Sequence, residues 1–403
     1  MRKIKLISAV AGVLLVLYGL VWVSPYNYLL KGVKMTYLQG ESSAHFLDWK
    51  GFDLRTVQNS PEKINRIETV ETAQSVELQS SELKSMLEKT HSGSFLVLKD
   101  GKIVCEKYFN GISDTSHQNS FSMAKTVITL LTQIAIQKGY ISSWDVKAAE
   151  LIPWVGEGSA NADWIQSLTL RHLSTMTAGL EYNEGYVSPL GITAKSYYSS
   201  NVESVMRSVP IIREPGSQFE YQSGATQLLG FALLAAISDE SNEKNGRKRY
   251  GHIADFAAEQ LWQPLGMEAS AFWSLDRENG NELAFCCLNA ISRDFAKLGL
   301  MVLNQGRCNG QQIVDSAFIE MASKPFKMPN YGHSFWLAHK GTDAENEFHY
   351  FQGLNGQYIA IVPEKNMVVV RTGHGIDRGT NNDDKVFRCV RTYVDEAVKQ
   401  FGK

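Results

Sequence analysis

Two residues at the start of an apolar segment have the types and the spacing needed for nucleophilic catalysis. Ser122 and Lys125 are three positions apart, and residues 123–131 are mostly apolar with a helical period. Side chains at positions i and i+3 of a helix lie on the same face. The helix dipole and partial burial would lower the pKa of Lys125, so that its neutral amine could accept the proton of the Ser122 hydroxyl. We therefore predict that Ser122 is a covalent nucleophile assisted by Lys125.

The Ser-x-x-Lys spacing alone is weak evidence, because the chain contains it a second time. Ser81 and Lys84 have the same separation but lie in a polar segment. A short motif therefore needs support from other parts of the site. Residues 215–225 offer such support, since a Pro-Gly turn there precedes Tyr221, which stands just before another apolar helix. A phenol beside a lysine ammonium would have a lowered pKa, so Tyr221 is predicted to act as a base in the proton relay.

A glycine-rich bend near the C-terminus is the third segment that could take part in this chemistry. Residues 350–364 read as a strand, a bend with two glycines and a second strand. Glycine lets a backbone approach a ligand closely, so an N–H group of this segment could join that of Ser122 in an oxyanion hole. Taken alone, the same segment would also suit an ordinary hairpin.

The elements that must position these residues change in type along the chain. A hairpin with an Asp100-Gly101 turn is predicted over residues 94–108. Helical periods then predominate, over residues 122–138, 169–176, 202–209, 227–236, 253–261 and 292–304. Strand composition returns over residues 334–338, 347–351, 357–362 and 367–371, before a last helix over 383–401. This order predicts an α/β (α+β) fold, with an antiparallel sheet built from both chain ends and flanked by helices, and a mainly helical subdomain over about residues 140–290.

Two further segments complete the expected organisation. Residues 181–200 are polar and aromatic without a regular period, and are predicted to be a loop that contacts the substrate. Residues 31–88, with a short strand over 49–54 and a helix over 80–89, are predicted to be a juxtamembrane segment and the start of the catalytic domain. Residues 89–403 would form the rest of that domain.

The N-terminus has the pattern of a membrane segment. Arg2, Lys3 and Lys5 precede residues 6–23, which carry no charge and end in aromatic side chains. About 18–20 apolar residues can span a bilayer, and no clear cleavage site follows. We therefore predict that residues 1–30 are an uncleaved anchor, with a removed signal peptide as the alternative. The basic N-terminal side would place the catalytic domain outside the cytoplasm, at the periplasmic face of a bacterial inner membrane.

Composition limits the possible partners and cofactors. The 403 residues are 44% hydrophobic with a formal net charge of −2, which gives no indication of a nucleic-acid partner. Five cysteines are too few for a disulfide scaffold, and the adjacent Cys286 and Cys287 have a poor geometry for bonding each other. No Cys/His cluster has the spacing of a zinc site. The sequence therefore predicts no metal and no cofactor.

Several segments together resemble a known family, in the same order along the chain. They are residues 122–125, 170–180, 215–230, 288–300 and 356–358. The chain resembles the serine β-lactamase-related hydrolases, which comprise class C β-lactamases, D,D-peptidases, related carboxylesterases and 6-aminohexanoate-oligomer hydrolases. The resemblance covers about residues 90–400 and implies a β-lactamase/transpeptidase-like fold. It also implies that an ester or amide is hydrolysed through an acyl-enzyme on Ser122, with Lys125 and Tyr221 as the proton relay.

The chain departs from the family pattern at two motifs. Ser223 stands where class C β-lactamases have an asparagine. Where β-lactamases and D,D-peptidases have Lys-Thr-Gly, the best match is residues 351–353, Phe-Gln-Gly, which implies that the second oxyanion donor is the Leu354 N–H. Residues 371–373, Arg-Thr-Gly, look like the motif but fall at the end of the following strand.

The missing lysine bears on the expected substrate, because it is the cation that would pair with the carboxylate of a penicillin or a peptide. We therefore predict an esterase or amidase of small molecules, closest to the 6-aminohexanoate-oligomer hydrolase branch. A penicillin-interacting D,D-peptidase or β-lactamase and a non-catalytic binding domain of the same fold are the alternatives. Substrate contacts are predicted at Tyr186, Ser223, Gly353 and Cys287.

Overall fold

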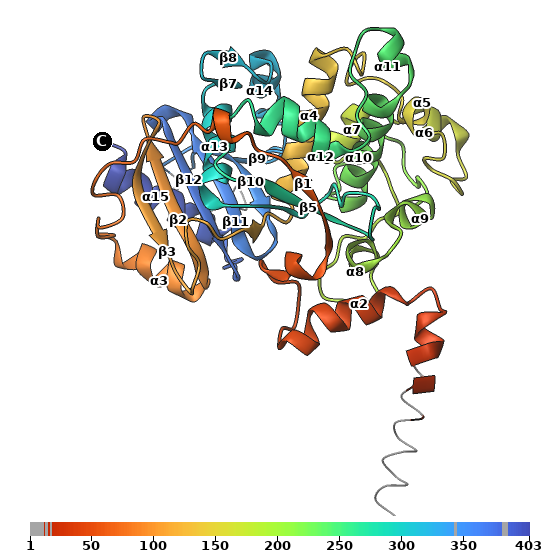
Figure 1. The fold of residues 1–403 in the computed structure, drawn as a ribbon, viewed down its shortest axis with the longest axis horizontal. Coiled ribbons are helices and arrows are strands. Elements are labelled where there is room, and N and C mark those ends of the chain that lie inside the picture. Colours follow the sequence, from red (N-terminus) through yellow and green to blue (C-terminus); the bar gives the residue numbers. More distant parts are fainter. Residues whose placement is uncertain (1–11, 13–14, 17, 342–344, 381–385) are drawn as a thin grey trace, which may run out of the picture.

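A six-stranded antiparallel sheet forms one side of the computed structural model, which describes residues 12, 15–16, 18–341, 345–380 and 386–403 (Figure 1). The strand order is β3-β2-β12-β11-β10-β9. The strands are β2 (Ser92–Lys99), β3 (Lys102–Tyr108), β9 (Trp336–Ala338), β10 (Phe348–Gly353), β11 (Gln357–Val362) and β12 (Met367–Gly373). Because β2 pairs with β12, with Val97 opposite Val369, the two ends of the chain meet in the middle of the sheet. This pairing confirms the predicted sheet.

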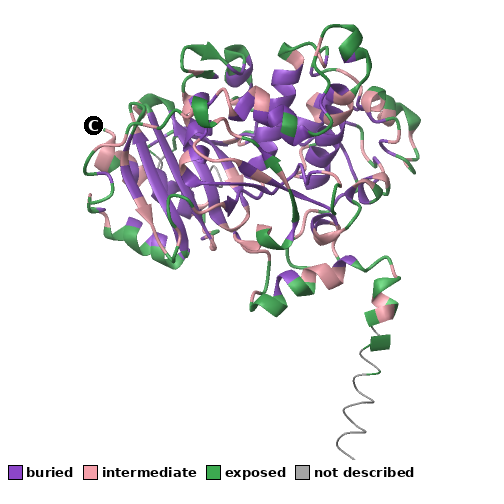
Figure 2. Ribbon diagram, viewed as in Figure 1, coloured by how far each residue is buried: buried purple, intermediate pink, exposed green. Residues whose placement is uncertain are grey.

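Helices cover both faces of this sheet (Figure 1). α13 (Ser292–Leu303) packs against β11 and β12 on one face, while α3 (Ser81–Lys89) and α15 (Arg388–Phe401) pack on the other. Alternate residues of β11 accordingly belong to different hydrophobic clusters, Ile359 to one and Tyr358 to the other. Figure 2 shows the sheet as a buried layer with exposed residues on the outer helices and loops. The predicted start of the last helix, at residue 383, lies outside the described residues.

The helical part of the molecule is built around α4 (Met123–Gln137), the helix that follows Ser122. Every residue from Met123 to Ala135 is buried, because most of the segment is apolar or small on all sides. The two exceptions, Lys125 and Gln133, have hydrogen-bond partners in the interior. α10 (Ser223–Ser238) packs against α4 and against α7 (Leu170–Ser174). The remaining elements here are α5 (Ala148–Leu151), α6 (Ala162–Ser167), α9 (Val202–Arg207), α11 (Ser241–Lys244), α12 (Ile253–Ala257), α14 (Ser316–Ala322), β7 (Arg307–Cys308) and β8 (Gln311–Gln312).

A small second sheet, which the sequence does not predict, leads into the site. Its order is β1-β5-β6-β4, with β1 (Asp53–Val57), β4 (Gln118–Asn119), β5 (Ala271–Leu275) and β6 (Leu288–Ala290). β4 ends three residues before Ser122, so its pairing with β6 fixes the entry of the chain into α4. β4 and β6, of two and three residues, are too short to give a detectable alternation in a sequence, and the strand predicted over residues 49–54 overlaps β1 only at Asp53 and Leu54.

The predicted loop over residues 181–200 contains a helix, α8 (Ile192–Tyr198). Thr193, Ser196 and Tyr197 are buried at helical spacing, but two of the three are polar, so the period is not visible as hydrophobicity. α2 (Tyr28–Met35) packs against α8. Residues that precede the family-like segments therefore fold onto the catalytic part of the chain.

The predicted N-terminal membrane anchor is contradicted. Residues 1–11, 13–14 and 17, which make up much of it, lie outside the described residues. In the part of the chain that the structure describes, no helix combines the length and the apolar character needed to cross a bilayer. The predicted transmembrane helix, the membrane partner and the extracytoplasmic, periplasmic location that depended on them are therefore wrong.

Candidate active site

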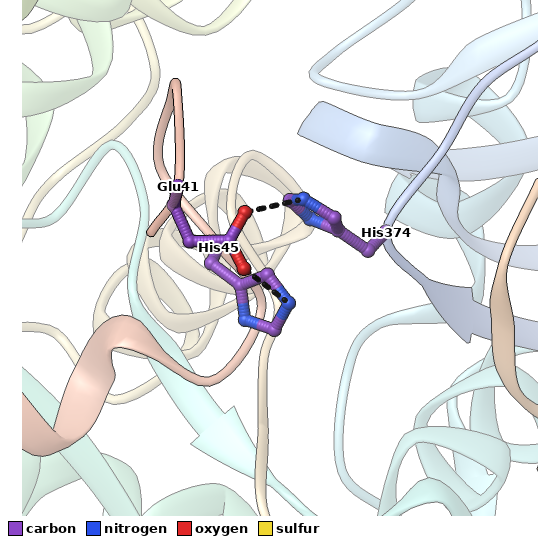
Figure 3. A group of neighbouring side chains, drawn as sticks. All are labelled: Glu41, His45 and His374. Carbon is purple, nitrogen blue, oxygen red and sulfur yellow. Dashed lines mark ion pairs between the residues drawn. The ribbon is translucent and has the colours of Figure 1, made fainter. Parts of the chain in front are cut away.

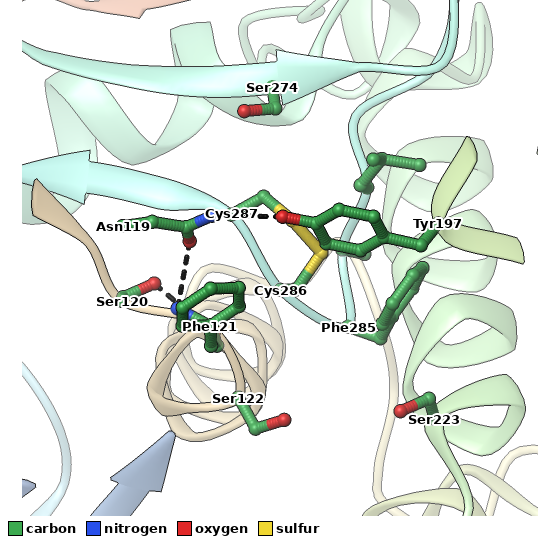
Figure 4. Close-up of a disulfide and its surroundings, with 12 residues drawn as sticks. Asn119, Ser120, Phe121, Ser122, Tyr197, Ser223, Ser274, Phe285, Cys286 and Cys287 are labelled. Atoms are coloured by element: carbon green, nitrogen blue, oxygen red, sulfur yellow. Dashed lines mark hydrogen bonds between the residues drawn. A yellow bond between two sulfur atoms is a disulfide. The ribbon is translucent and has the colours of Figure 1, made fainter. Parts of the chain in front are cut away.

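The turn that carries Ser122 is held in an unusual backbone conformation. Phe121 is buried and has a φ of 44°, in the left-handed region that bulky residues rarely adopt. Its N–H donates to Oδ1 of Asn119 at 2.8 Å, and its ring lies 6.4 Å from that of Tyr197 (Figure 4). These contacts place Ser122 at the N-terminal end of α4, as the spacing predicts.

Lys125 lies one turn further along α4 and is fully enclosed. Its Nζ is 2.9 Å from Ser122 Oγ, 3.0 Å from Ser223 Oγ and 2.9 Å from the carbonyl oxygen of Phe285. Burial lowers the pKa of Lys125 to about 8, against a smaller opposing effect of the Glu184 carboxylate. A neutral amine, which can accept a proton from Ser122, is therefore accessible near neutral pH. Figure 4 shows the hydroxyls of Ser122 and Ser223 directed toward one another.

Tyr221 lies against the same amine, but its ionisation differs from the prediction. Lys125 Nζ is 5.1 Å from the centroid of the Tyr221 ring. Burial raises the pKa of Tyr221 well above 10, and the neighbouring Tyr331 and Glu184 raise it further, while a hydrogen bond with Ser122 acts in the opposite direction. The predicted lowering does not occur, because burial is the largest effect on this pKa and the hydrogen bond with Ser122 does not offset it. Tyr221 is therefore a neutral phenol near neutral pH, which can donate and accept a proton but is not a phenolate.

Glu184 is the site residue that the sequence did not reveal. Its Oε1 accepts hydrogen bonds from Ser223 Oγ at 2.7 Å and from the Tyr186 hydroxyl at 2.6 Å, and its Oε2 accepts the Ser223 N–H at 2.7 Å. Ser223 thus joins a carboxylate to Lys125. The polar character of residues 181–200 indicated substrate contacts, but no spacing singled out Glu184, because Ser223, which connects it to Lys125, lies on α10, far away in the sequence.

Gly353 lets the end of β10 approach the nucleophile turn. A Cβ atom at this position would lie 2.2 Å from the carbonyl oxygen of Ser120, so the strand can reach this depth only with glycine. The next residue, Leu354, lines the same cavity as Ser122. Gly353 therefore allows close packing against the nucleophile turn, and the residue after it, Leu354, reaches the cavity.

A cavity of about 480 Å³ opens over Ser122. Tyr186 and Ser223, both predicted to contact substrate, line it, whereas the predicted Gly353 and Cys287 do not. The N-terminal segment also contributes to its wall, over residues 29–44. No pattern in the sequence indicates this contribution, because it depends on how α2 packs against α8.

A disulfide joins the adjacent Cys286 and Cys287 beside the site (Figure 4). The sequence-based expectation that these neighbours would not bond each other is therefore wrong. Cys287 has a φ of 75°, a left-handed backbone that the sequence does not indicate. Cys286 faces the cavity, and the carbonyl of the preceding Phe285 contacts Lys125, so this turn forms part of the amine's surroundings.

Glu41, His45 and His374 are the group among the described residues that could hold a metal ion, since each offers a ligand atom within 4.8 Å of the others (Figure 3). Glu41 lies 3.7 Å from Nε2 of His45 and 3.3 Å from Nε2 of His374. However, Nδ1 of His45 accepts the Leu47 N–H at 3.1 Å, so the neutral ring carries its proton on Nε2. A metal at Nε2 would break that hydrogen bond, and the cluster is better suited to bridging two imidazoles through one carboxylate.

Comparisons with known proteins agree with this geometry. A family model described as "Beta-lactamase" matches residues 82–375. A 6-aminohexanoate-dimer hydrolase of Paenarthrobacter ureafaciens is 21% identical over 325 residues, which cover 75% of this chain and 77% of the relative. The solved structure "Putative 6-aminohexanoate-dimer hydrolase from Bacillus anthracis" has a TM-score of 0.70 at 22% identity and covers 94% of this chain and 95% of its own. The structure of EstCE1, "a hydrolase with promiscuous acyltransferase activity", has a TM-score of 0.56 at 15% identity and covers 78% of this chain and 98% of its own.

Proposed function

Because the chain belongs to the beta-lactamase family of hydrolases, we propose that it cleaves an ester or amide bond through an acyl-enzyme on Ser122. The observation that carries this proposal is the 2.9 Å contact between Lys125 Nζ and Ser122 Oγ. It joins a nucleophile to a buried base whose pKa is lowered to about 8. The cavity above it is of a size that suits a small molecule.

The proposed reaction has two halves. Neutral Lys125 takes the Ser122 hydroxyl proton as Oγ attacks the substrate carbonyl carbon, and the N–H groups of Ser122 and Leu354 stabilise the resulting oxyanion. The proton then passes through the Tyr221 hydroxyl to the leaving oxygen or nitrogen, and the acyl group remains on Ser122. In the second half, water gives a proton to the same relay as its oxygen attacks the acyl carbon. The bond between the acyl carbon and Ser122 Oγ then breaks, the relay returns the proton to Oγ, and the acid leaves.

Two observations favour simple esters and amides over penicillins and D-alanyl peptides. Phe351 occupies the place of the family's motif lysine, and a relative is named as a hydrolase of the 6-aminohexanoate dimer. Linear amides and short-chain esters are therefore the proposed substrates.

A substrate panel with matched serine variants tests the proposal. The full chain is assayed with short-chain p-nitrophenyl esters, linear amides and nitrocefin. We expect ester or amide turnover that falls at least about a thousandfold in Ser122→Ala, since the nucleophile is lost. Ser81→Ala is the control, because this exposed serine has the same Ser-x-x-Lys spacing on α3. Full turnover by Ser122→Ala would overturn the assignment, and preferred turnover of nitrocefin would indicate a penicillin-interacting enzyme instead.

A further inference from the structure

Residues 46–49 of the N-terminal region lie beside β4, the strand that leads into the turn that carries Ser122. The carbonyl oxygen of Phe46 accepts the backbone N–H of Asn119 at 2.8 Å. This contact brings Asp48 to the side chain of the same residue, and Oδ1 of Asp48 accepts a hydrogen bond from Nδ2 of Asn119 at 3.1 Å. Phe46 and Asp48 both precede residue 82, where the match to the family begins.

Asp48, Asn119 and Tyr197 form a closed ring of hydrogen bonds. The Tyr197 hydroxyl donates to Oδ2 of Asp48 at 2.8 Å and accepts from Nδ2 of Asn119 at 3.2 Å. Both protons of Nδ2 therefore have acceptors, and Oδ1 of Asn119 faces the other way, toward the Phe121 N–H (Figure 4). The reverse orientation of the amide would place its oxygen against the Asp48 carboxyl group and its N–H groups against the Phe121 N–H.

The hydrogen bond from Asn119 to Asp48 does not depend on the charge of the carboxyl group. Burial raises the pKa of Asp48 to about 7, against the opposing effect of the hydrogen bonds from Tyr197 and Asn119. The proton of the neutral acid can lie on Oδ2, because the Tyr197 hydroxyl that faces it can accept as well as donate. Oδ1 remains an acceptor for Asn119 in both states, so the orientation of the amide is kept.

The oriented amide of Asn119 stabilises a backbone conformation that is unfavourable for the residue concerned. Phe121 has a φ of 44°, which costs free energy in a bulky side chain, and its N–H donates to Oδ1 of Asn119 at 2.8 Å. Ser122 is the next residue, so this turn sets the direction of its Oγ. A displacement of a reacting atom near 1 Å can cost about a hundredfold in rate.

We propose that Asp48 is a positioning residue for the nucleophile, because it fixes the Asn119 amide that holds the left-handed turn at Phe121, from which Ser122 projects. This inference rests on the proposed function, since it concerns the reactivity of Ser122. Asp48 is not among the residues that line the cavity, so it acts through Asn119 and not on the substrate.

Two rates test the proposal, that of the reaction of Ser122 with a fluorophosphonate probe and kcat/KM for a p-nitrophenyl ester. Asp48→Ala is expected to lower both by about tenfold or more, because the Asn119 amide is then free to turn. Asp48→Asn should stay within about threefold of the wild type, since its oxygen can face Asn119 and its nitrogen the Tyr197 hydroxyl. Asp53→Ala is the matched control, because Asp53 is an exposed aspartate of the same N-terminal region, and it should leave both rates unchanged.

A second background separates positioning from a general loss of structure. Glycine adopts a positive φ without steric cost, so in Phe121→Gly the turn depends less on the Asn119 amide. The loss caused by Asp48→Ala should therefore shrink to about threefold or less in the Phe121→Gly background. An equal loss in both backgrounds, or wild-type rates in Asp48→Ala, would overturn this inference, while labelling of Ser122 in the wild type would leave the proposed function intact.

If the wild type is not labelled at Ser122, the proposed function fails, and hydrogen exchange of the Phe121 amide replaces the rate measurements. The exchange is followed by NMR in protein that carries isotope-labelled phenylalanine. Exchange at least about fivefold faster in Asp48→Ala than in the wild type and Asp53→Ala would support the role of Asp48 in holding this turn. Equal exchange in the three proteins would reject it.

Discussion

The pKa of Lys125 is affected by a carboxylate, that of Glu184, which the lysine does not contact directly. Ser223 contacts both Lys125 Nζ and Glu184, and the carboxylate opposes the lowering of the lysine pKa by burial. Activity needs the neutral amine, so kcat/KM should rise with pH and level off above about pH 8. Glu184→Gln removes the charge that favours the ammonium, so the rise should move to lower pH. The plateau should fall about tenfold, because a charge-assisted hydrogen bond to Ser223 is lost.

The measurement is a kcat/KM profile between about pH 5 and 10 with a neutral ester. The charged and titratable groups near Lys125 include Glu184 and Tyr221, and Tyr221 stays a neutral phenol over most of this range. Glu181→Gln is the matched control, since Glu181 is exposed and outside the cavity wall. A rise that stays in place or moves to higher pH in Glu184→Gln would contradict the assigned role of this carboxylate.

Residues with a local signature could be found from the sequence. Ser122, Lys125, Tyr221 and Ser223 all stand at the start of an apolar helix, where periodicity and motif spacing mark them, and the structure brings their side chains together. Glu184 has no such signature, because its role is created by a serine nearly forty residues away. The direction of the Tyr221 pKa shift could not be predicted from the sequence either, since it depends on burial and not on the neighbouring charge alone.

At the scale of secondary structure, the approach of β10 to the start of α4 has a direct consequence for catalysis. Gly353→Ala would place a methyl group against the Ser120 carbonyl, which a Cβ would approach to 2.2 Å. The strand end and the Leu354 N–H must then move away from Ser122. We expect kcat to fall by at least about tenfold, since displacements near 1 Å can cost about a hundredfold, and stability to fall by about 1–3 kcal/mol.

Paired measurements of kcat and of the urea midpoint separate the local effect from general loss of structure. Gly251→Ala serves as the control, because a Cβ there meets nothing within 4 Å. Wild-type kcat in Gly353→Ala would show that the position of this strand end is unimportant for the reaction.

Long elements were predictable and short ones were not. Five strands of the large sheet, all except β9, and the helices α4, α10, α13 and α15 have enough residues to show a period. The Asp100-Gly101 turn has φ values of 50° and 79°, which suit a tight hairpin. β4 and β6 have two and three residues, and α8 buries polar side chains. Their existence depends on pairing and packing with distant segments, which local pattern does not encode.

At the scale of the whole molecule, the role of the N-terminal region depends on contacts with distant segments, which the pattern of the region alone does not indicate. Hydropathy indicated an anchor followed by a juxtamembrane segment, whereas residues 29–44 contribute to the cavity wall and β1 pairs with β5. Asp48 further accepts a hydrogen bond from Asn119, the residue that holds the Phe121 N–H. The site is therefore completed by residues about seventy positions before the nucleophile.

Buried neutral histidines make the stability of the molecule depend on pH. His349 on β10 packs against Phe335, and burial lowers its pKa to about 4. Its Nε2 has no hydrogen-bond partner among the described residues. In the unfolded chain the pKa returns to about 6.5, so the unfolded state binds the extra proton between these values. The contribution of His349 to stability is therefore complete above pH 6.5 and is lost as the pH falls toward 4, by on the order of 3 kcal/mol.

His349→Leu removes this proton linkage while keeping an apolar side chain in the cluster, so the variant should lose less stability between pH 7 and pH 4 than the wild type. Urea midpoints at pH 7, 5.5 and 4 measure the difference. His252→Leu is the control, because His252 is exposed and its substitution should leave the pH dependence unchanged. The same slope in His349→Leu and the wild type would mean that this ring is already protonated, or reached by solvent, in the native state. Acid sensitivity would then have to arise elsewhere, and His333 is the next candidate, because burial lowers its pKa to about 3.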